Sequence, residues 1–139
     1  SYLASANKDA QVTTLEGAHS IAALARQTFD ALQLKNINLI TGNFDETLTS
    51  VANKNYDFIF IDGNHRKEPT LRYFNLLQSC VYNNSLMVFD DIHWSKEMEE
   101  AWEEIKNHSS VTLTVDLFFI GLVFFRKEQK EKEHFVVRF

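Results

Sequence analysis

Residues 56–65 read YDFIFIDGNH, an apolar stretch that ends abruptly on a carboxylate, a glycine and an imidazole. The four residues Phe58–Ile61 have no polar face, which predicts a strand covered on both sides within a parallel sheet. Asp62 then lies at the carboxyl end of this strand, where Gly63 lets the backbone turn sharply or approach a ligand closely. Open α/β sheets bind ligands outside the carboxyl ends of their strands. Asp62 and His65 are therefore candidates for a chemical site.

The rest of the chain alternates strand and helix patterns around this stretch. Apolar runs predict strands at residues 11–15, 37–40, 56–61 and 86–89, and helical spacing predicts helices at residues 18–34, 44–52, 69–81 and 95–107. Residues 111–115 and 119–125 should pair as an antiparallel hairpin because so few residues separate them, and residues 135–139 add a short strand. This order predicts an α/β fold: a mostly parallel sheet with helices on both faces and an antiparallel C-terminal hairpin.

The length of the chain sets the number of domains. At 139 residues, of which 45% are hydrophobic, the chain can bury one ordinary core and is too short for two typical domains. A single domain over residues 1–139 is predicted. Cys80 is the only cysteine, which excludes an intramolecular disulfide, and its apolar helical surroundings favour a buried position.

The net charge of the chain limits the classes of partner that it is expected to bind. The net charge is -5, from 14 basic and 19 acidic residues, and no basic stripe interrupts it beyond the mixed run at residues 126–133. A nucleic-acid footprint is therefore absent, and a small-molecule or protein partner is expected. No apolar run approaches the roughly 20 residues of a membrane span, so no membrane association and a cytoplasmic location are expected.

Acidic side chains follow three of the predicted strands at the point where each strand ends: Glu16, Asp62, and Asp90 with Asp91. Each alone is equally well explained as an ordinary loop residue, because acidic residues are common in turns. Together they can face one rim, because the carboxyl ends of parallel strands meet at the same edge of a sheet. Their joint placement predicts one site at this rim.

The first two strands end in groups that suit a nucleoside. Glu16, followed by the turn residue Gly17, closes a strand where a carboxylate can accept hydrogen bonds from a ribose diol. Gly42, Asn43 and Phe44 close the next strand and offer an amide for the edge of an adenine and a ring for its face. These residues predict the nucleoside half of a cofactor cleft.

With these motifs, the chain resembles the class I S-adenosylmethionine-dependent methyltransferases, in particular the metal-dependent O-methyltransferases of the catechol type and their bacterial relatives. The resemblance covers nearly the whole chain. It rests on Glu16 with Gly17 as ribose-binding residues, residues 42–44 as the adenine-contacting loop, and residues 60–65 and 87–91 as the ends of the fourth and fifth strands. It implies a Rossmann-like sheet. The closing hairpin of residues 111–125 resembles the family's seventh strand, which is inserted antiparallel.

The resemblance also implies an enzyme that transfers a methyl group from S-adenosylmethionine to a hydroxyl of a small-molecule acceptor. Asp62 and His65 are the implied catalytic residues, with Asp62 also beside the cofactor and with His65 or His93 taking the hydroxyl proton as general base. Asp62, Asp90 and Asp91 are the implied ligands of a divalent cation such as Mg²⁺.

The chain departs from the family in one respect. The family's first strand and its glycine-rich loop, which cradles the methionine end of the cofactor, should precede Ser1, and none of the 4 glycines lies in such a setting. A truncated, inactive domain is therefore expected, in which residues 11–15 pair directly with residues 56–61 or a second chain fills the missing position. Unpaired strand edges then favour a homodimer.

Two other functions compete with the enzyme. One is a non-catalytic remnant of the fold that acts as a binding or structural domain, which binding of S-adenosylhomocysteine would distinguish from an intact cofactor site. The other is a phosphoacceptor receiver domain, because clustered aspartates at strand ends also bind Mg²⁺. A receiver places its acidic pair before the single aspartate and a lysine after a later strand. Here Asp62 comes first and no lysine follows a strand at that place, which disfavours a receiver.

Overall fold

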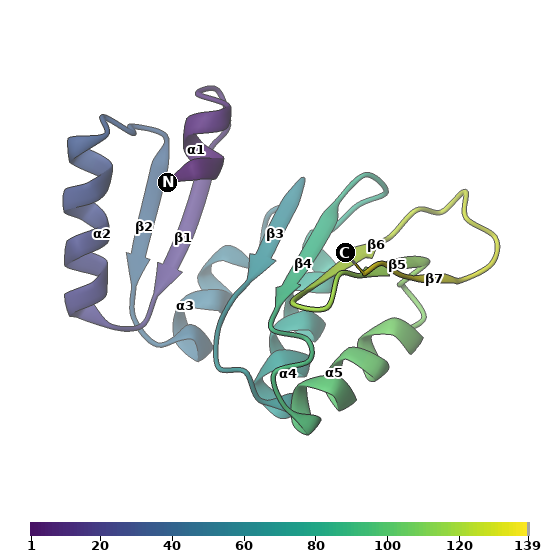
Figure 1. Ribbon diagram of the computed structural model, residues 1–139. Helices are drawn as coiled ribbons and strands as arrows, with labels where there is room; N and C mark the ends of the chain where they lie inside the picture. Colours follow the sequence, from purple (N-terminus) through teal and green to yellow (C-terminus); the bar gives the residue numbers. More distant parts are fainter. Residues whose placement is uncertain (139) are drawn as a thin grey trace. The chain divides into compact units, whose positions relative to one another are not determined.

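A computed structural model of the protein describes residues 1–138. Its chain divides into two compact units, Ser1–Val51 and Ala52–Phe139, and the strands form two sheets (Figure 1). The alternation of strands and helices confirms the predicted α/β class. Direct pairing of residues 11–15 with residues 56–61 is not found, and that prediction is wrong, because these segments belong to different sheets.

The first unit contains a pair of parallel strands and three helices. Its elements are α1 (Tyr2–Ala6), β1 (Val12–Glu16), α2 (His19–Ala31), β2 (Ile37–Thr41) and α3 (Phe44–Val51). Val12 lies opposite Ile37 and Glu16 lies opposite Thr41, so the two strands end level with each other. The polar residues that follow β1 and β2 therefore share one edge of this small sheet.

Asn36 ties the N-terminal segment to the start of β2. Its side-chain amide donates to the backbone carbonyl oxygens of Ala4, Asn7 and Ala10, at 3.1, 3.2 and 2.9 Å. The backbone carbonyl of Asn36 accepts a hydrogen bond from the amide of Val12 at 2.9 Å. A single side chain thus satisfies the carbonyl groups of a segment that would otherwise have few partners.

The second unit contains a five-stranded sheet in the order β3-β4-β6-β5-β7 (Figure 1). Its elements are β3 (Phe58–Ile61), α4 (Lys67–Leu77), the 3-10 helix η1 (Gln78–Cys80), β4 (Leu86–Asp90), α5 (Lys96–Asn107), β5 (Leu113–Asp116), β6 (Ile120–Phe124) and β7 (Glu133–Val136). β3 and β4 are parallel, whereas β6 is antiparallel to β4 and β5, which confirms the predicted hairpin. β7 runs parallel to β5 at Glu133–Val136, whereas the strand was predicted at residues 135–139; residues 137 and 138 are not in a strand, and Phe139 lies outside the described residues.

Aromatic side chains from the sheet and from both helices form the core of the second unit. Phe74 of α4, Phe89 of β4 and Trp102 of α5 are each at most 2% exposed. The ring of Phe89 lies 6.2 Å from that of Phe74 and 6.4 Å from that of Trp102, in tilted arrangements that aromatic pairs favour. Cys80 is buried as a free thiol, as its apolar surroundings predict.

Helix α5 begins where the sequence predicts. The hydroxyl of Ser95 accepts a hydrogen bond from the backbone amide of Met98 at 3.2 Å, which satisfies a donor that a helix start leaves free. The buried side chains of α5 recur at helical spacing: Met98, Ala101, Trp102 and Ile105.

In the part of the chain that the structure describes, no helix combines the length and apolar character needed to cross a membrane.

One face of the five-stranded sheet carries exposed aromatic rings. Phe58 and Phe60 of β3 are 40% and 46% exposed, while Ile59 and Ile61, which point to the opposite face, are half-buried. Phe135 of β7 is 50% exposed. The prediction that β3 is covered on both sides is therefore wrong for this structure, because its side chains alternate between more and less exposed positions.

Gly121 allows the ring of Trp102 to approach β6 closely. A Cβ atom at position 121 would lie 2.7 Å from two ring carbons of Trp102 and 3.0 Å from Cγ2 of Ile92. Real Cβ atoms almost never lie within 3.0 Å of such neighbours. The absence of a side chain at this position is therefore a packing requirement of the core.

We predict that Gly121→Ala destabilises the second unit by about 1–3 kcal/mol, because overpacking a filled core forces side chains out of their preferred rotamers. Urea denaturation followed by far-UV circular dichroism, which reports on the helices of both units, would measure the change in midpoint. Gly17→Ala is the matched control, since the nearest atom to a Cβ at position 17 is the backbone oxygen of Gly42 at 3.9 Å. An equal midpoint shift for both variants would contradict the packing argument.

Candidate active site

The pairing of β3 with β4 brings carboxylates from two strands to one edge of the sheet. Ile61 lies opposite Phe89 in the parallel register, so Asp62 and Asp90, the next residue of each chain segment, are neighbours at the carboxyl ends. Asp91 follows directly. Within the second unit, the acids that follow these two strands therefore lie at one edge of the sheet, and their sharing of one site stays a prediction.

His65 lies between two of these carboxylates. Its Nε2 is 3.6 Å from Oδ1 of Asp62 and its Nδ1 is 3.9 Å from Oδ2 of Asp91, which are ion-pair distances for a protonated ring. The His65 side chain is 32% exposed, so solvent and ligands can reach it. The ring of Trp94 lies 6.4 Å away. Both ring nitrogens of His65 therefore face carboxylate oxygens at this edge of the sheet.

The loops that carry these side chains adopt an unusual backbone conformation. Asn64, just before His65, has φ of 61°, and Asp91 has φ of 53°. Both values lie in the left-handed region, which residues other than glycine rarely adopt and which concentrates at functional sites. Two such residues on adjacent loops mark this edge of the sheet as a candidate functional site.

Among the carboxyl groups of Asp62, Asp90 and Asp91, that of Asp90 has a raised pKa. Burial raises the pKa of its carboxyl group, and the nearby carboxylates of Asp62 and Asp91 raise it further. A group whose pKa is raised in the folded state stabilises the fold below its unfolded pKa and loses that contribution as the pH rises through the folded value. Ionised Asp90 therefore opposes folding at neutral pH.

We predict that Asp90→Asn raises the free energy of unfolding at pH 7.5, by about 0.5–1 kcal/mol, since the carboxyl is only partly buried and is screened by solvent. The gain should shrink as the pH falls towards the ordinary carboxyl pKa of about 3.9. Chemical denaturation at several pH values would measure it. Glu131→Gln, at an exposed position in the loop before β7, is the control. A destabilising effect of Asp90→Asn at neutral pH would contradict this reading of the cluster.

A metal site is not evident at this edge. Within residues 1–138, no three histidine, cysteine or acidic side chains are arranged to hold a metal ion. The imidazole of His65 instead lies between Asp62 and Asp91. The predicted cation at Asp62, Asp90 and Asp91 therefore stays a prediction that the geometry does not support.

An aromatic hollow adjoins the carboxylates. It has a volume of about 120 Å³ and is lined by Asp91, His93, Trp94, Phe118 and Phe119. Trp94 is 71% exposed and Phe119 is 66% exposed, so large apolar surfaces face solvent beside charged groups. Sequence analysis did not identify Phe118 and Phe119 as site residues. Two phenylalanines in the short turn of a hairpin, where polar residues are usual, are the signal that could have revealed them.

His93 is engaged at both ring nitrogens. Its Nε2 lies 2.8 Å from Oδ2 of Asp116 and its Nδ1 lies 3.3 Å from Oε1 of Glu99. Of the two histidines that the sequence offers as a general base, His65 is therefore the better placed, because neither of its nitrogens makes a direct hydrogen bond that must first be broken.

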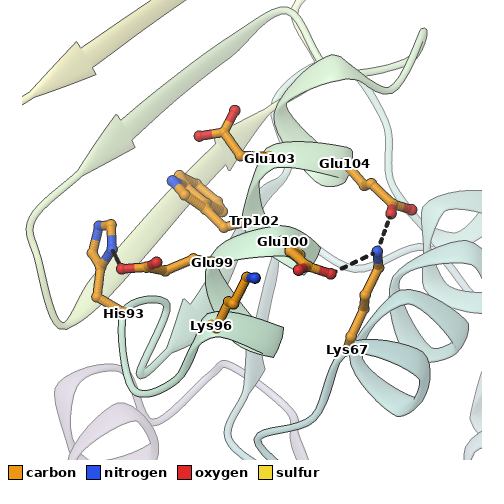
Figure 2. Close-up of a pocket in the computed structure, with 8 residues that line it drawn as sticks. All are labelled: Lys67, His93, Lys96, Glu99, Glu100, Trp102, Glu103 and Glu104. Carbon is orange, nitrogen blue, oxygen red and sulfur yellow. Dashed lines mark hydrogen bonds and ion pairs between the residues drawn. The ribbon is translucent and has the colours of Figure 1, made fainter.

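A larger cavity, of about 490 Å³, lies along α5 and has a different character (Figure 2). Its lining includes Lys67, whose Nζ is 2.7 Å from Glu104 and 3.1 Å from Glu100. Figure 2 shows these ion pairs on one side of α5 and the pair between His93 and Glu99 on the other. Neither Asp62 nor His65 lines this cavity. Size alone therefore does not identify the reaction site.

The predicted nucleoside-binding residues lie together at the edge of the small sheet in the first unit. Glu16 ends β1, and its Oε1 accepts a hydrogen bond from the backbone amide of Ala18 at 2.8 Å. The amide of Gly42 donates to the backbone oxygen of Glu16 at 3.0 Å. A Cβ at Gly17 would lie 3.9 Å from the backbone oxygen of Gly42. The two strand ends thus form one polar surface.

Gly42 and Asn43 also have structural roles. Gly42 has φ of 151°, and a Cβ there would lie 2.9 Å from Cγ2 of Thr47, so only glycine fits without strain. Asn43 precedes Phe44, the first residue of α3, and its side-chain oxygen accepts from the amide of Asp45 at 3.0 Å. This is the bond that an asparagine makes at the start of a helix. The cofactor-binding roles of these residues stay predictions.

Parallel strand pairs, followed by helices and with polar residues at the strand ends, are typical of Rossmann-like α/β folds. A profile described as a methyltransferase domain matches residues 1–92. The chain belongs to this methyltransferase family. None of the curated proteins compared with the chain matches it.

Solved structures of methyltransferases share the fold at low sequence identity. An O-methyltransferase from Bacillus cereus, in complex with SAH, is 22% identical, with a TM-score of 0.66, over 82% of this chain and 62% of its own. The SAH-bound methyltransferase PaMTH1 from Podospora anserina is 14% identical, with a TM-score of 0.73, over 84% and 61%. The O-methyltransferase TomG from Streptomyces achromogenes, in complex with SAM, is 16% identical, with a TM-score of 0.72, over 90% and 66%. The chain thus spans about three fifths to two thirds of the length of these relatives.

Proposed function

We propose that the protein is an S-adenosylmethionine-dependent O-methyltransferase that acts on a hydroxyl group of a small molecule. The observation that carries the proposal is the position of His65 between Asp62 and Asp91, beside an aromatic hollow at the carboxyl ends of the strands. Family membership supports the reaction class. The structures of O-methyltransferases with SAH and with SAM support the cofactor.

His65 would take the proton of the acceptor hydroxyl. The acceptor lies against Trp94 and the hairpin aromatics, with its hydroxyl directed to the imidazole. When bound, S-adenosylmethionine would supply the electrophilic methyl group for this oxygen. Asp62 and Asp91 stabilise the imidazolium that results, because opposite charges within about 4 Å attract. General-base catalysis of this kind contributes about 10²–10⁴-fold in rate.

The nucleoside half of the cofactor would be held by the first unit. Glu16 accepts from the ribose hydroxyls, Gly17 and Gly42 allow close backbone approach, and Asn43 and Phe44 contact the adenine. The level ends of β1 and β2 support this assignment, because they gather these residues on one edge.

A divalent cation held by the carboxylates of the second unit is an additional hypothesis, which a chelator tests.

We predict that Glu16→Ala weakens binding of S-adenosylhomocysteine at least tenfold, because two charge-assisted hydrogen bonds to the ribose depend on this carboxylate. Isothermal titration calorimetry would measure the change. Glu46→Ala is the matched control, since Glu46 is an exposed acid at the start of α3 in the same unit. Unchanged affinity in Glu16→Ala would remove Glu16 from the cofactor site.

We predict that His65→Gln lowers the rate of methyl transfer by about 10²-fold or more, because glutamine keeps polar contacts but cannot serve as a general base. Transfer of a radiolabelled methyl group to a panel of hydroxylated aromatic compounds would measure it. His19→Gln, on α2, is the control. A rate that is unchanged in His65→Gln but abolished by EDTA would favour metal-assisted catalysis over a histidine base.

The same assay separates the enzyme from a binding domain. The second candidate function is a non-catalytic domain that retains the methyltransferase fold. Absence of both methyl transfer and S-adenosylhomocysteine binding would support this candidate and overturn the enzyme proposal.

A further inference from the structure

Asp116, the last residue of β5, joins three segments that are distant in the chain. Its Oδ2 lies 2.8 Å from Nε2 of His93, in the loop after β4. Its Oδ1 accepts from the backbone amide of Phe118 at 2.8 Å and from Nη1 of Arg138, beyond β7, at 2.9 Å. The Asp116 side chain is only 10% exposed. Charge-assisted hydrogen bonds in such a setting are strong and specific in direction.

The carboxyl group of Asp116 stays ionised despite its burial. Burial by itself would raise the pKa of Asp116, but the hydrogen bonds from His93, from the Phe118 amide and from Arg138 lower the pKa overall. An ionised carboxylate accepts these bonds more strongly than a neutral acid would. The network is therefore complete at neutral pH.

Phe118 is the residue that this network surrounds. Its φ of 73° lies in the left-handed region, which is unfavourable for a bulky side chain unless neighbouring contacts fix it. The ring of His93 stacks on that of Phe118 at 5.4 Å, and the guanidinium carbon of Arg138 lies 5.5 Å from the ring centre. The two side chains that hydrogen-bond Asp116 thus also hold the ring of Phe118.

The conformation of Phe118 determines where Phe119 lies. The two rings meet edge to face at 5.0 Å, and both line the aromatic hollow with Trp94 and Asp91. If the hairpin turn relaxed, both rings would leave the hollow together, because they are adjacent in the chain. The hollow therefore depends on Asp116 and Arg138, which do not line it, as well as on His93, which does.

We propose that Asp116, His93 and Arg138 form a latch of positioning residues that fixes Phe118 and Phe119 as the wall against which the methyl acceptor lies. This inference rests on the proposed function, since it assigns the aromatic hollow to the acceptor. The hydrogen bonds of the latch join its members to one another, to Glu99, to the amide of Phe118 and to the backbone oxygen of Val137. The latch therefore sets the affinity for the acceptor and leaves proton transfer to His65.

The test uses Asp116→Asn, which keeps the shape of the side chain and removes its charge. Catechol serves as the probe for the hollow, and its dissociation constant is measured by ligand-observed NMR. The exchange rate of the Phe118 backbone amide, whose acceptor is Asp116, is a second readout that needs neither cofactor nor activity. We expect Asp116→Asn to bind catechol at least fivefold more weakly and to exchange the Phe118 amide at least tenfold faster.

Three further variants complete the test. His93→Phe keeps the stacked ring but removes the hydrogen bond to Asp116, so it should reproduce both effects even if Asp116→Asn fails to fold. Phe119→Ala shortens the wall itself and should weaken catechol binding while leaving exchange at Phe118 slow. Glu128→Gln is the matched control, because it neutralises an exposed carboxylate that takes no part in the latch. This carboxylate accepts a hydrogen bond from the side-chain amide of Asn83 at 2.8 Å. This variant should change neither readout.

The outcomes separate the latch from the proposed function. Wild-type exchange at Phe118, or wild-type catechol affinity, in both latch variants would overturn the latch. Failure of the wild-type protein to bind catechol would instead overturn the assignment of the hollow to the acceptor, whatever the exchange rates show. Weaker binding with faster exchange in both latch variants would support the inference.

Discussion

The parallel pairing of β3 with β4 is the constraint on which the candidate site depends. Ile61 opposite Phe89 places Asp62 and Asp90 side by side at one edge of the sheet, although their charges repel. A slip of the register by one residue would turn every side chain of β3 to the other face. The apolar packing of the two strands therefore holds together carboxylates that would separate if they were free to do so.

Local patterns in the sequence predict most of the helices and strands of the fold. The start of α5 at Ser95 and the antiparallel β5–β6 hairpin were predictable because capping residues, helical spacing and short connections leave signals within a few positions. The exposure of Phe58 and Phe60 was not predictable in the same way. A continuous apolar run shows that residues are suited to burial, but coverage of both faces depends on elements that are distant in the sequence.

The candidate site was predictable only in part, for the same physical reason. Asp62, His65 and Asp91 follow strands directly, so their convergence could be inferred from topology. The network around Asp116 joins residues 93, 116 and 138, which share no spacing or motif. Contacts of this kind form when separate segments fold against each other, and only coordinates reveal them. The hairpin aromatics fall between the two cases, because two phenylalanines in a short turn are visible in the sequence but their position beside Asp91 and Trp94 is not.

The contact between Gly121 and Trp102 has a consequence for how the sequence can vary. A side chain at position 121 would occupy space that the indole ring already fills. The two positions are therefore epistatic: a larger residue at 121 becomes acceptable only after the ring at 102 has been replaced by a smaller one. Among homologous sequences, the volumes at these two positions should vary inversely. Lineages that exchange them must also pass through the tryptophan change first, which gives the substitutions a fixed order.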